Sequence, residues 1–570
     1  MTISSLDSAT VTLQQLIDAN KSQQQKLAEQ LTAMIATSIQ EAFKQAGLAQ
    51  AQSIAHIPFQ QFRLDNRQLE ANDVFVLLKS QTANPQKSRD YLLQAAEQAA
   101  FILSEIDPSV SLSEADNSSN TTNEPQTDSI ASMQQLAALP CPVLYVPNIR
   151  DFLGSLIQAR LQYQQPATLP TVVAVTGTNG KTTISQLAAQ LTQLMGQSSA
   201  VMGTAGNGRL GALVQASHTT GDALAVQQFL YQMGTEQAEI LALEASSHGL
   251  DQQRLQGMPV TVAIYTNLSR DHLDYHADMA EYAAAKAKLF DKAHFPDLTH
   301  AIINIDDEHA QVMLDMANAS GLTVWTYSLD SSKAATFVAA DITPSLQGVQ
   351  INLRIEFGNE RTDNIEIVSP LLGRFNVANL LAAIAAVVAL DDDLAMNIER
   401  IVPAIAKLQG AVGRMQRVPS NDGCFIVDYA HTPDALSQVL ASLKTHCKGQ
   451  LWAVFGCGGD RDAGKRPLMA QAGLAGADQV VLTADNPRTE DPKMILQDMQ
   501  AGMTAEQYQR THIEPARQTA IEYAVSHSGV DDIVVIAGKG HETYQEINNV
   551  RYDFDDSVVL QQALSQAGRV

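Results

Sequence analysis

The segment from Val173 to Thr183, VAVTGTNGKTT, joins a strand-like apolar run to a glycine-rich turn that carries a lysine and several hydroxyl residues. These residue types at this spacing bind phosphate: backbone N–H groups cradle the oxygens, Lys181 reaches the distal phosphates, and Thr182 can ligate Mg²⁺. The general pattern GxxxxGK[ST] asks for glycine where this chain has Val175. The segment therefore predicts a variant phosphate-binding loop, with an ordinary glycine-rich turn as the alternative.

Two further groups of polar residues follow apolar runs. Glu244 ends the run in LALEASSHGL, where a buried carboxylate needs a partner. A cation is the natural partner, and a helix N-cap or a salt bridge is the alternative. The segment TNLSRDHLDYH places Asp271, His272 and His276 after another run. We interpret His272 as a Mg²⁺ ligand or an orienting group, against the alternative of a structural histidine.

The composition limits the partners that the chain can have. Its 570 residues include 37 Lys and Arg against 61 Asp and Glu, so the net charge is −24 and the pI is about 4.8. No whole-molecule field favours nucleic acid or an anionic membrane. A mean hydropathy of −0.09 is typical of a soluble globular protein, and we find neither a signal peptide nor a membrane-spanning run. The four cysteines have no close pairing pattern, which favours reduced thiols in the cytoplasm.

Apolar runs alternate with helical stretches in two long regions, which predicts parallel sheets covered by helices. The runs are TVVAVTG, AEILALEASS, VTVAIYTNLS and HAIINIDDE in the first region, and CFIVDYAH, LWAVFGCGG, DQVVLTADN and DDIVVIAGKG in the second. Nearly every run ends in polar residues. These residues should gather at the carboxyl edges of the two sheets, where open α/β folds bind ligands.

The chain is long enough for about three domains. We predict an N-terminal α/β domain at 1–150, a central ATP-binding domain at 151–411 and a C-terminal Rossmann-like α/β domain at 412–570. The first domain begins with an amphipathic helix on which Leu27, Leu31 and Phe43 share a face. Ser104 to Ser132 has six acidic residues, no basic ones and no aromatics, so we predict a disordered surface insertion there.

A series of segments in a fixed order makes the chain resemble the Mur ligase family, from about Leu64 to Asp556. The segments are TGTNGKTT, HTTGDA, EASSHGLDQQR, NLSRDHLDYH, AAAK, INIDDE, PLLGRFNVANLLAA, GRMQRV, VDYAHTPDAL, FGCGGDRDAGKRPLM, ADNPRTEDP and AGKGHE. Within the family, the likeness is to members that add the third residue of the peptidoglycan stem peptide. It implies an ATP-dependent ligase that adds meso-diaminopimelate to UDP-N-acetylmuramoyl-L-alanyl-D-glutamate through an acyl phosphate, in cytoplasmic peptidoglycan precursor synthesis.

The resemblance also implies site residues. Those for ATP are Gly177, Thr178, Asn179, Gly180, Lys181, Thr182, Thr183, Asn304, Arg414, Asp428 and Tyr429. Those for the UDP-muramoyl dipeptide are Asn66, Thr219, Thr220, Ser246, Gln252 and Arg254, and those for diaminopimelate are Arg461, Asp485, Asn486, Pro487, Arg488, Gly538 and Glu542. The implied catalytic residues are Lys181, Glu244, His272 and Lys286, and a pair of Mg²⁺ ions would be held by Thr182, Glu244, His272 and Lys286.

Lys286 enters only through the resemblance, which implies that CO₂ converts it to a carbamate. By composition alone it is a solvated lysine on a short alanine-rich helix, EYAAAKAKLF. The first domain departs from the family, because its DSR signature reads Asp65-Asn66-Arg67 here. A monomer is expected.

Chemistry supports the diaminopimelate set, because an amino acid with an extra carboxylate needs fork-shaped cationic donors such as Arg461 and Arg488. It also needs a carboxylate such as Glu542 for an ammonium group. The alternative interpretation is that each arginine is a solvent-exposed charge on a loop and does not bind the substrate. The resemblance adds a further indication: lysine-adding members of the family differ in the stretch occupied here by DNPR, so its presence favours diaminopimelate over lysine.

Three other functions remain open. A lysine-adding ligase of the same family is the nearest, and a folylpolyglutamate synthetase-like ligase shares the phosphate loop and the chemistry. A nucleotide-binding regulator without catalysis is the third, and intact Lys181, Glu244, His272 and Lys286 count against it.

Overall fold

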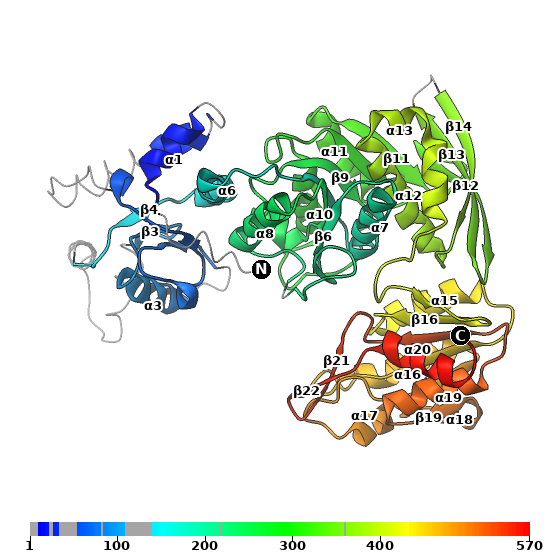
Figure 1. Ribbon diagram of the computed structural model, residues 1–570. Coiled ribbons are helices and arrows are strands. Elements are labelled where there is room, and N and C mark those ends of the chain that lie inside the picture. The colour runs from blue at the N-terminus through cyan, green and yellow to red at the C-terminus, as the bar shows by residue number, and fades with distance from the viewer. Residues whose placement is uncertain are drawn as a thin grey trace.

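The computed structural model describes residues 10–21, 25, 27–33, 54–80, 84–108, 138–216, 218–357 and 361–570. Sheets of four, ten and six strands follow one another along this part of the chain, with a separate two-stranded sheet near its end. Figure 1 shows the three larger units in chain order, from blue through green to red. The predicted α/β fold class with mostly parallel sheets is confirmed. Residues 109–132 of the predicted acidic insertion, and Phe43 of the predicted first helix, lie outside the described residues.

The first sheet is parallel throughout, in the order β1-β2-β3-β4. Its strands and helices are α1 (Leu13–Asn20), β1 (Phe62–Arg63), β2 (Val74–Leu77), α3 (Pro85–Ala96), β3 (Phe101–Ser104), β4 (Val143–Tyr145) and α6 (Leu153–Gln164). Alternate residues of β2 and β3 enter two separate cores, one with α1 and α6 and the other with α3. Burial on both faces explains why these strands read as unbroken apolar runs.

The central sheet has the order β14-β13-β12-β11-β10-β9-β5-β8-β6-β7. Its strands are β5 (Thr171–Thr176), β6 (Ser199–Gly203), β7 (Gly206–Gly208), β8 (Ile240–Glu244), β9 (Val260–Tyr265), β10 (His300–Asn304), β11 (Thr323–Ser328), β12 (Phe337–Ser345), β13 (Gly348–Phe357) and β14 (Arg361–Ser369). The longer helices are α7 (Lys181–Leu194), α8 (Ala223–Thr235), α10 (Met279–Ala287), α11 (Ala310–Ala319) and α12 (Arg374–Ala389); α9 (Ser247–Asp251), α13 (Asp392–Met396) and α14 (Val402–Ile405) are short.

The central strands bury both faces. In β5, Val173 and Val175 enter a core shared with α7 and α12, whereas Val172 and Ala174 enter a second core shared with α8, α10 and α11. The carboxyl ends of β5, β8, β9 and β10 therefore meet at one edge, between the two helix layers. This arrangement gathers the polar residues after these strands, as the sequence predicted.

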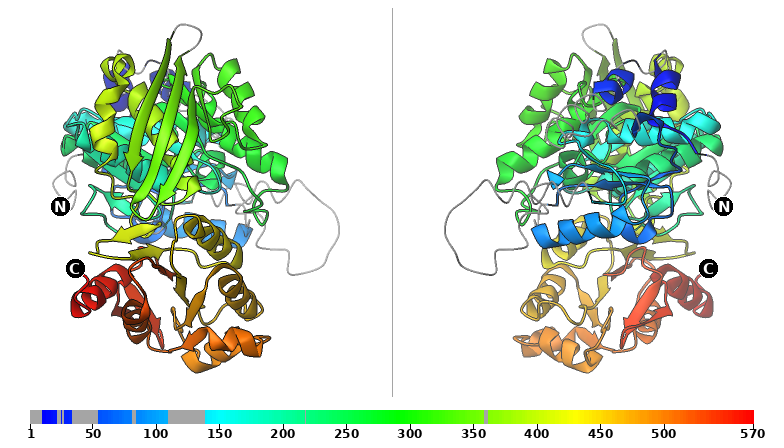
Figure 2. Two further views of the ribbon diagram at one scale, coloured as in Figure 1. Left: turned by 90° about the vertical axis from the view of Figure 1, so that its right-hand side faces the viewer. Right: turned by 90° about the vertical axis from the view of Figure 1, so that its left-hand side faces the viewer.

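Strands β12, β13 and β14 form an antiparallel extension that the sequence analysis did not identify. They pair over most of their length and appear as long neighbouring strands in Figure 2. The segment Gly348 to Phe357, GVQINLRIEF, alternates apolar and polar residues. Its apolar side chains are buried except for the half-buried Phe357, and its polar side chains are half-buried or exposed. This period-two pattern is typical of half-buried strands and differs from the continuous apolar runs that predict a parallel sheet.

The C-terminal sheet has the order β15-β16-β20-β17-β18-β19 and is parallel except for β15. Its strands are β15 (Gln416–Val418), β16 (Cys424–Asp428), β17 (Leu451–Phe455), β18 (Gln479–Leu482), β19 (Thr511–Ile513) and β20 (Ile533–Ala537). Helices α15 (Pro433–Lys444), α16 (Lys465–Gly476) and α17 (Pro492–Met499) pack on one face, and α19 (Arg517–His527) and α20 (Asp556–Gln566) on the other. The chain adds α18 (Ala505–Gln509) and a hairpin of β21 (Tyr544–Ile547) and β22 (Val550–Asp553).

The join between the central and C-terminal units is fastened to α7. Gln190 accepts from the backbone of Gln409 and donates to Gly410, at 3.0 and 2.6 Å, and Gln186 accepts from Val412 at 3.0 Å. These glutamines are one helical turn apart and lie on the helix that starts at Lys181. The helix therefore connects the phosphate loop with the segment entering the C-terminal unit.

A buried ion pair ties together the carboxyl ends of two C-terminal strands. Arg517 donates from Nε and Nη2 to Asp556 at 2.8 and 2.7 Å, and both side chains are fully buried. The guanidinium also donates to the carbonyls of Ala484 and Ala537, just after β18 and at the end of β20. Arg517 thus fixes the two loops that follow these strands.

We expect Asp556→Ala to lower the free energy of unfolding by about 3–5 kcal/mol, because it leaves Arg517 buried without its counter-charge. The double variant Arg517→Met/Asp556→Leu should recover most of this loss. Urea unfolding followed by circular dichroism measures both. A single variant as stable as the wild type would contradict the assignment of Arg517 to a fully desolvated pair.

No helix in the described ranges is both long and apolar enough to span a membrane.

Candidate active site

The predicted phosphate loop lies between β5 and α7. A Cβ on Gly177, whose φ is +148°, would lie 1.8 Å from Thr266 Oγ1, so only glycine fits this approach. Asn267 holds the loop by accepting from the N–H groups of Thr178 and Asn179 at 2.8 and 3.0 Å. The N–H groups of the first turn of α7 have no acceptor within the helix, as an anion site requires.

Lys181 folds back over the loop. Its Nζ donates to the carbonyls of Gly177 and Thr178, both at 2.9 Å. Burial lowers the pKa of Lys181, and the nearby Glu244 carboxylate opposes this effect, whereas Arg414 adds to it. An anion bound to the loop would reduce the electrostatic repulsion between Lys181 and Arg414.

Glu244 ends β8 beside this loop and is almost fully buried. Its Oε1 accepts from the Thr204 N–H at 2.8 Å, and its Oε2 accepts from the Thr204 hydroxyl at 3.1 Å. A Cβ on Gly203 would lie 2.1 Å from Oε1, so the glycine makes room for the carboxylate. The N-cap alternative is wrong, because Ser246 caps α9 by accepting from Gly249 N at 3.0 Å.

His272 lies in a cluster of rings next to the loop. Its backbone is left-handed, with φ +53°, and its Nε2 is 3.5 Å from the Asp271 carboxylate. The ring packs edge-on to His248 at 4.9 Å and to Tyr282 at 5.9 Å. The hydroxyl of Tyr282 is 3.2 Å from Thr178 Oγ1, which joins the cluster to the phosphate loop.

Lys286 is buried on α10, so its interpretation from composition as a solvated lysine is wrong. Its Nζ donates to the Gly177 carbonyl at 2.8 Å and lies 4.5 Å from the centre of the Tyr282 ring. Composition does not report burial, because the packing of α10 against the loop depends on distant segments. Burial and the nearby charge of Lys181 hold the pKa of Lys286 well below its usual range.

These residues fit Mg²⁺ and a carbamate. Glu244 and Thr182 offer hard oxygen ligands beside a phosphate site, and the lowered pKa of Lys286 favours the neutral amine that reacts with CO₂. Across the described ranges, no three His, Cys, Asp or Glu side chains form a ready metal cluster. Phosphate oxygens would therefore have to complete the shell.

Five of the six residues predicted for the UDP-muramoyl dipeptide form one network around Glu244. Thr220 Oγ1 donates to the Glu244 carbonyl at 2.8 Å and accepts from Ser246 N at 3.0 Å. Arg254 donates to the Thr220 carbonyl at 2.9 Å and to Gln252 Oε1. The fifth residue is Thr219, whose Oγ1 lies 3.1 Å from the Thr204 hydroxyl that contacts Glu244.

Asn66, the sixth, is not part of this network. Its side chain donates to Gln94 Oε1 of α3 at 2.8 Å. A different residue connects the two units: Arg150 donates to the Gln252 carbonyl at 3.1 Å, to Glu105 at 2.8 Å and to the Lys79 carbonyl at 2.9 Å.

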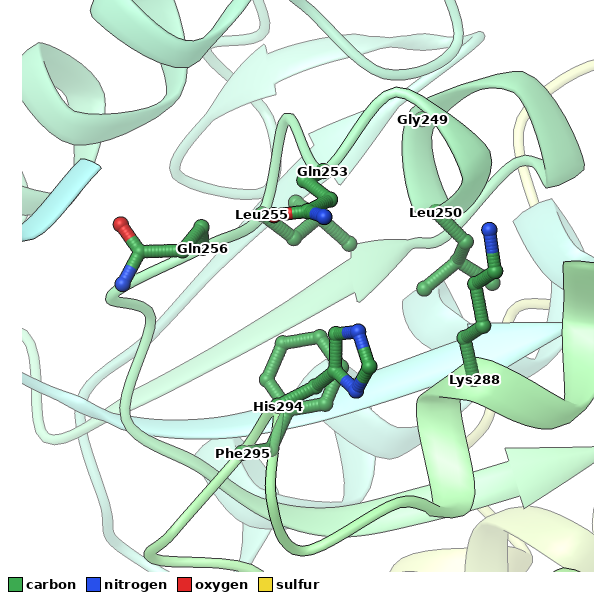
Figure 3. Close-up of a pocket in the computed structure, with 8 residues that line it drawn as sticks. All are labelled: Gly249, Leu250, Gln253, Leu255, Gln256, Lys288, His294 and Phe295. Carbon is green, nitrogen blue, oxygen red and sulfur yellow. The ribbon is translucent and has the colours of Figure 1, made fainter. Parts of the chain in front are cut away.

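A small cavity behind this network does not locate the site. It is lined by Gly249, Leu250, Gln253, Leu255, Gln256, Lys288, His294 and Phe295, drawn in Figure 3. Its volume of about 20 Å³ has room for one water molecule and not for a sugar or a nucleotide. None of the predicted site residues lines it.

Of the residues predicted for ATP, Arg414, Asp428 and Tyr429 lie at the junction with the C-terminal unit, and we call these three the nucleoside group. Asp428 accepts from the N–H groups of Met415 and Ala430, both at 2.7 Å, and burial raises its pKa against these donors. The Arg414 guanidinium lies 4.5 Å from the centre of the Tyr429 ring. Asn304 stands apart, at the end of β10, and donates to the Thr266 carbonyl at 2.7 Å.

The residues predicted for diaminopimelate gather after β17, β18 and β20. Asn486 donates to Glu542 Oε2 at 2.9 Å, and the φ of Gly538 is +118° beside Asp485. A Cβ on Gly458 would lie 2.9 Å from Arg488 Nη1 and 3.7 Å from Arg461 Cγ, so both arginines flank this glycine. A Cβ on Gly459 would lie 1.9 Å from the carbonyl oxygen of Pro487.

The loop after β20 connects this group with the nucleoside group. A Cβ on Gly540 would lie 2.7 Å from Tyr429 Cβ and 2.8 Å from the Gly413 carbonyl oxygen. Arg488 is half-buried; it donates to the Gly459 carbonyl at 2.7 Å and lies 3.8 Å from Glu546.

The sequence analysis missed Thr204 and Lys539. Thr204 follows β6, and Lys539 follows β20 and is fully buried beside Asp485, Asn486 and Glu542. The signal that selected Glu244, a polar residue directly after an apolar run, was present at both positions.

Comparisons with known proteins match most of the chain. The model of the Mur ligase middle domain matches residues 175–387, and that of the Mur ligase glutamate ligase domain matches 413–540. A protein of Vibrio vulnificus named UDP-N-acetylmuramoyl-L-alanyl-D-glutamate–2,6-diaminopimelate ligase is 40% identical over 90% of this chain and 95% of its own length. A protein of the same name from Pseudomonas aeruginosa is 44% identical over 71% of this chain and 80% of its own length.

Solved structures agree. One titled as the structure of the same ligase has a TM-score of 0.66 and 41% identity, and the match covers 93% of this chain and 99% of that one. A Mycobacterium tuberculosis folylpolyglutamate synthase has a TM-score of 0.51 and 18% identity over 74% of this chain and 95% of that one. At that identity, the second match reports a shared fold alone.

Proposed function

This chain belongs to the Mur ligase family, and from this premise we propose that it adds meso-diaminopimelate to UDP-N-acetylmuramoyl-L-alanyl-D-glutamate with ATP. It is an ATP-dependent amide-bond ligase of peptidoglycan synthesis. The observation that carries the substrate assignment is 40% identity over 95% of a relative's length, because it leaves no substrate-binding unit without a counterpart.

The proposed division of labour follows the units of the fold. Residues 1–150 bind the uridine part with Asn66, 151–411 bind ATP and the dipeptide, and 412–570 bind the incoming amino acid. The protein acts as a monomer in the cytoplasm.

The first chemical step is proposed to be phosphorylation of the D-glutamyl γ-carboxylate, a poor electrophile that becomes an acyl phosphate. Lys181 and the N–H groups at the start of α7 hold the phosphates and offset charge on the transferred group. Arg414 reaches the same region from the C-terminal unit, as its effect on the pKa of Lys181 indicates.

Mg²⁺ supplies charge neutralisation when bound. Thr182, Glu244, His272 and carbamylated Lys286 are proposed to hold it. Thr204 orients Glu244 through two hydrogen bonds, and Tyr282 packs between Lys286 and the ring of His272.

In the second step, the amine of diaminopimelate attacks the acyl phosphate, and inorganic phosphate leaves. Thr219, Thr220, Ser246, Gln252 and Arg254 position the dipeptide, and the network joining them to Glu244 keeps it near the phosphates. Arg461, Asp485, Asn486, Pro487, Arg488, Gly538 and Glu542 hold the amino acid. Since the nucleotide, metal and amino-acid groups come from two units, the reaction is proposed to require both to close on ATP.

Arg488 is expected to select diaminopimelate, because its guanidinium can hold the distal carboxylate that lysine lacks. An unpaired charge in the closed pocket costs several kcal/mol, which corresponds to about a thousandfold preference. Arg488→Ala should therefore raise the KM for diaminopimelate steeply, leave the KM for ATP unchanged and narrow the gap to lysine. Steady-state kinetics with both amino acids measures this.

Arg510→Ala is a matched control, because Arg510 donates to the carbonyls of Leu474 and Ala477 at the opposite edge of the sheet. An Arg488 variant that keeps its full preference would disprove the role of Arg488 while leaving the ligase activity intact.

The overall assignment is tested by product mass. The purified protein is incubated with ATP, the UDP-dipeptide and either diaminopimelate, lysine or no amino acid, and folate with glutamate is tested in parallel. A UDP-tripeptide that contains diaminopimelate is expected. A lysine product at equal rate, or glutamylated folate, would select one of the rival ligases, and no ATP turnover with any substrate would favour the regulator.

A further inference from the structure

Lys539 is a buried cation among residues assigned to the incoming amino acid. It directly follows Gly538 after β20, and its side chain has 0% exposure. Its Nζ is 3.2 Å from both Asn486 Oδ1 and Glu542 Oε2, and 3.8 Å from Asp485 Oδ1. A lysine is seldom fully buried without a specific partner, and this one has several.

The contacts of Lys539 fix how Asn486 presents its amide. Asn486 Oδ1 accepts one hydrogen bond from Lys539 and a second from the Glu546 N–H at 2.9 Å. These two donors identify this side of the amide as the oxygen. The NH₂ group therefore faces Glu542 and donates to Oε2 at 2.9 Å. Oε2 of Glu542 is engaged by two donors, which leaves Oε1 as the oxygen available to a ligand.

Two carboxylates share this cation. Burial raises the pKa of Asp485, Arg517 and Lys539 lower it, and Glu542 raises it again. Oδ1 of Asp485 has no hydrogen-bond partner among the described residues. Without Lys539, the buried Asp485 carboxylate would lie beside Glu542 with one cation fewer, and it would take up a proton more readily.

We propose that Lys539 is a positioning residue that supplies the counter-charge to Asp485 and holds Glu542 turned so that its Oε1 receives an ammonium group of the incoming amino acid. This inference rests on the proposed function, because it assigns Lys539 a task at the diaminopimelate pocket. Lys539 does not itself contact the reacting amine.

Other charged and titratable groups surround this pocket and are present in every variant considered below. Arg517 and Asp556 lie behind Asp485, and Tyr429 and His541 face Glu542 from the nucleoside side. On the β21 side, the neighbouring groups are Tyr544, Arg488, Glu546 and Arg551. A change confined to the Lys539 variant therefore reports the loss of its charge.

The pH dependence has a definite sign. Lys539 lowers the pKa of Asp485, so removing this cation raises that pKa further. At a pH below the raised value, the carboxyl is protonated and cannot pair with an ammonium. Binding should then improve as the pH rises, whereas the wild type should show no such change in the same range.

The central test is the KM for diaminopimelate of Lys539→Met between about pH 6 and about pH 9, where one unit of pKa change corresponds to about a tenfold change in the ionised fraction. We expect the KM to be raised at least about tenfold at the acid end and to fall toward the wild-type value as the pH rises. The KM for ATP and for the UDP-dipeptide should stay unchanged. Lys539→Arg, which keeps the charge, should restore a flat profile.

Two further variants separate charge from packing. Arg510→Met removes a cation from the opposite edge of the same sheet and should lower stability without changing any KM. Glu542→Gln should raise the KM for diaminopimelate at every pH.

The outcomes are distinct. A Lys539→Met enzyme with a raised but pH-independent KM, or with a lower melting temperature and normal kinetics, would overturn the positioning role. If Lys539→Met does not fold, Glu542→Gln decides. A wild-type KM for diaminopimelate in that variant would show that binding does not need the Glu542 carboxylate, and the proposed role of Lys539 would then be wrong. A wild-type enzyme that ignores diaminopimelate would instead refute the proposed function.

Discussion

Lys181→Ala is expected to reduce turnover by about a thousandfold or more, since a preorganised donor to the transferred phosphate is worth about two to three orders of magnitude and Lys181 also carries a full charge. Within the described part of the chain, its Nζ donates hydrogen bonds only to the carbonyls of Gly177 and Thr178, in the same loop. The fold should therefore survive the substitution. The measurement is phosphate release together with formation of the acyl phosphate, trapped with hydroxylamine.

Lys448→Ala is a suitable control because Lys448 is exposed and distant in sequence from the loop. The melting temperature of Lys181→Ala should remain close to that of the control. Near-normal turnover in Lys181→Ala would show that the assignment of the ATP site to this loop is wrong, despite the sequence resemblance.

Lys286→Ala is expected to be nearly inactive, and so is Lys286→Met, although methionine fills the same space. If the lysine served only to pack α10 against the loop, methionine would replace it with little loss. If it acts as a carbamate, both variants lose a carboxylate that holds Mg²⁺, and added short carboxylic acids should restore part of the activity of Lys286→Ala. Kinetics with and without such acids measures the difference.

The carbamate itself can be detected by ¹³C NMR after labelling with bicarbonate. The neutral amine is the form that reacts with CO₂, and burial next to Lys181 holds the pKa of Lys286 below its usual range. The modification should therefore form near neutral pH and be lost on acidification. Lys288, two residues later and paired with Asp251 at 2.8 Å, is the matched site at which no carbamate is expected. A fully active Lys286→Met enzyme would end the carbamate hypothesis.

The positions of Glu244, Asp428 and Asp485 could be predicted because the first two end, and the third follows, a strand that reads as an apolar run. Parallel strands bring their carboxyl ends to one edge, so a local pattern is enough to place distant residues together. The phosphate loop was predictable for the same reason, since its strand, glycines and lysine are contiguous. Burial of Lys286 and Lys539 was not predictable in this way, because it depends on which segments pack over them.

Roles that depend on contacts between units were also out of reach. Arg150 holds the Gln252 carbonyl together with Glu105 and Lys79, and these partners are spread over more than a hundred positions of the chain. Asn66 was assigned from the family pattern alone, and the structure places it against Gln94 rather than beside Gln252. Its role in binding uridine stays a prediction.

Fastening of residues 409–412 to α7 limits where the C-terminal unit can turn. Gln409, Gly410 and Val412 are bound to the two glutamines of that helix. The next residue is Gly413, whose φ is +67° and whose N–H donates to Gln416. A Cβ there would lie 2.2 Å from the His541 N–H, so the backbones touch at that point. The connection between the two units is thus a short hinge held by the phosphate-binding helix α7 rather than a flexible linker. Any rotation of the amino-acid pocket relative to the nucleotide site has to start from this hinge.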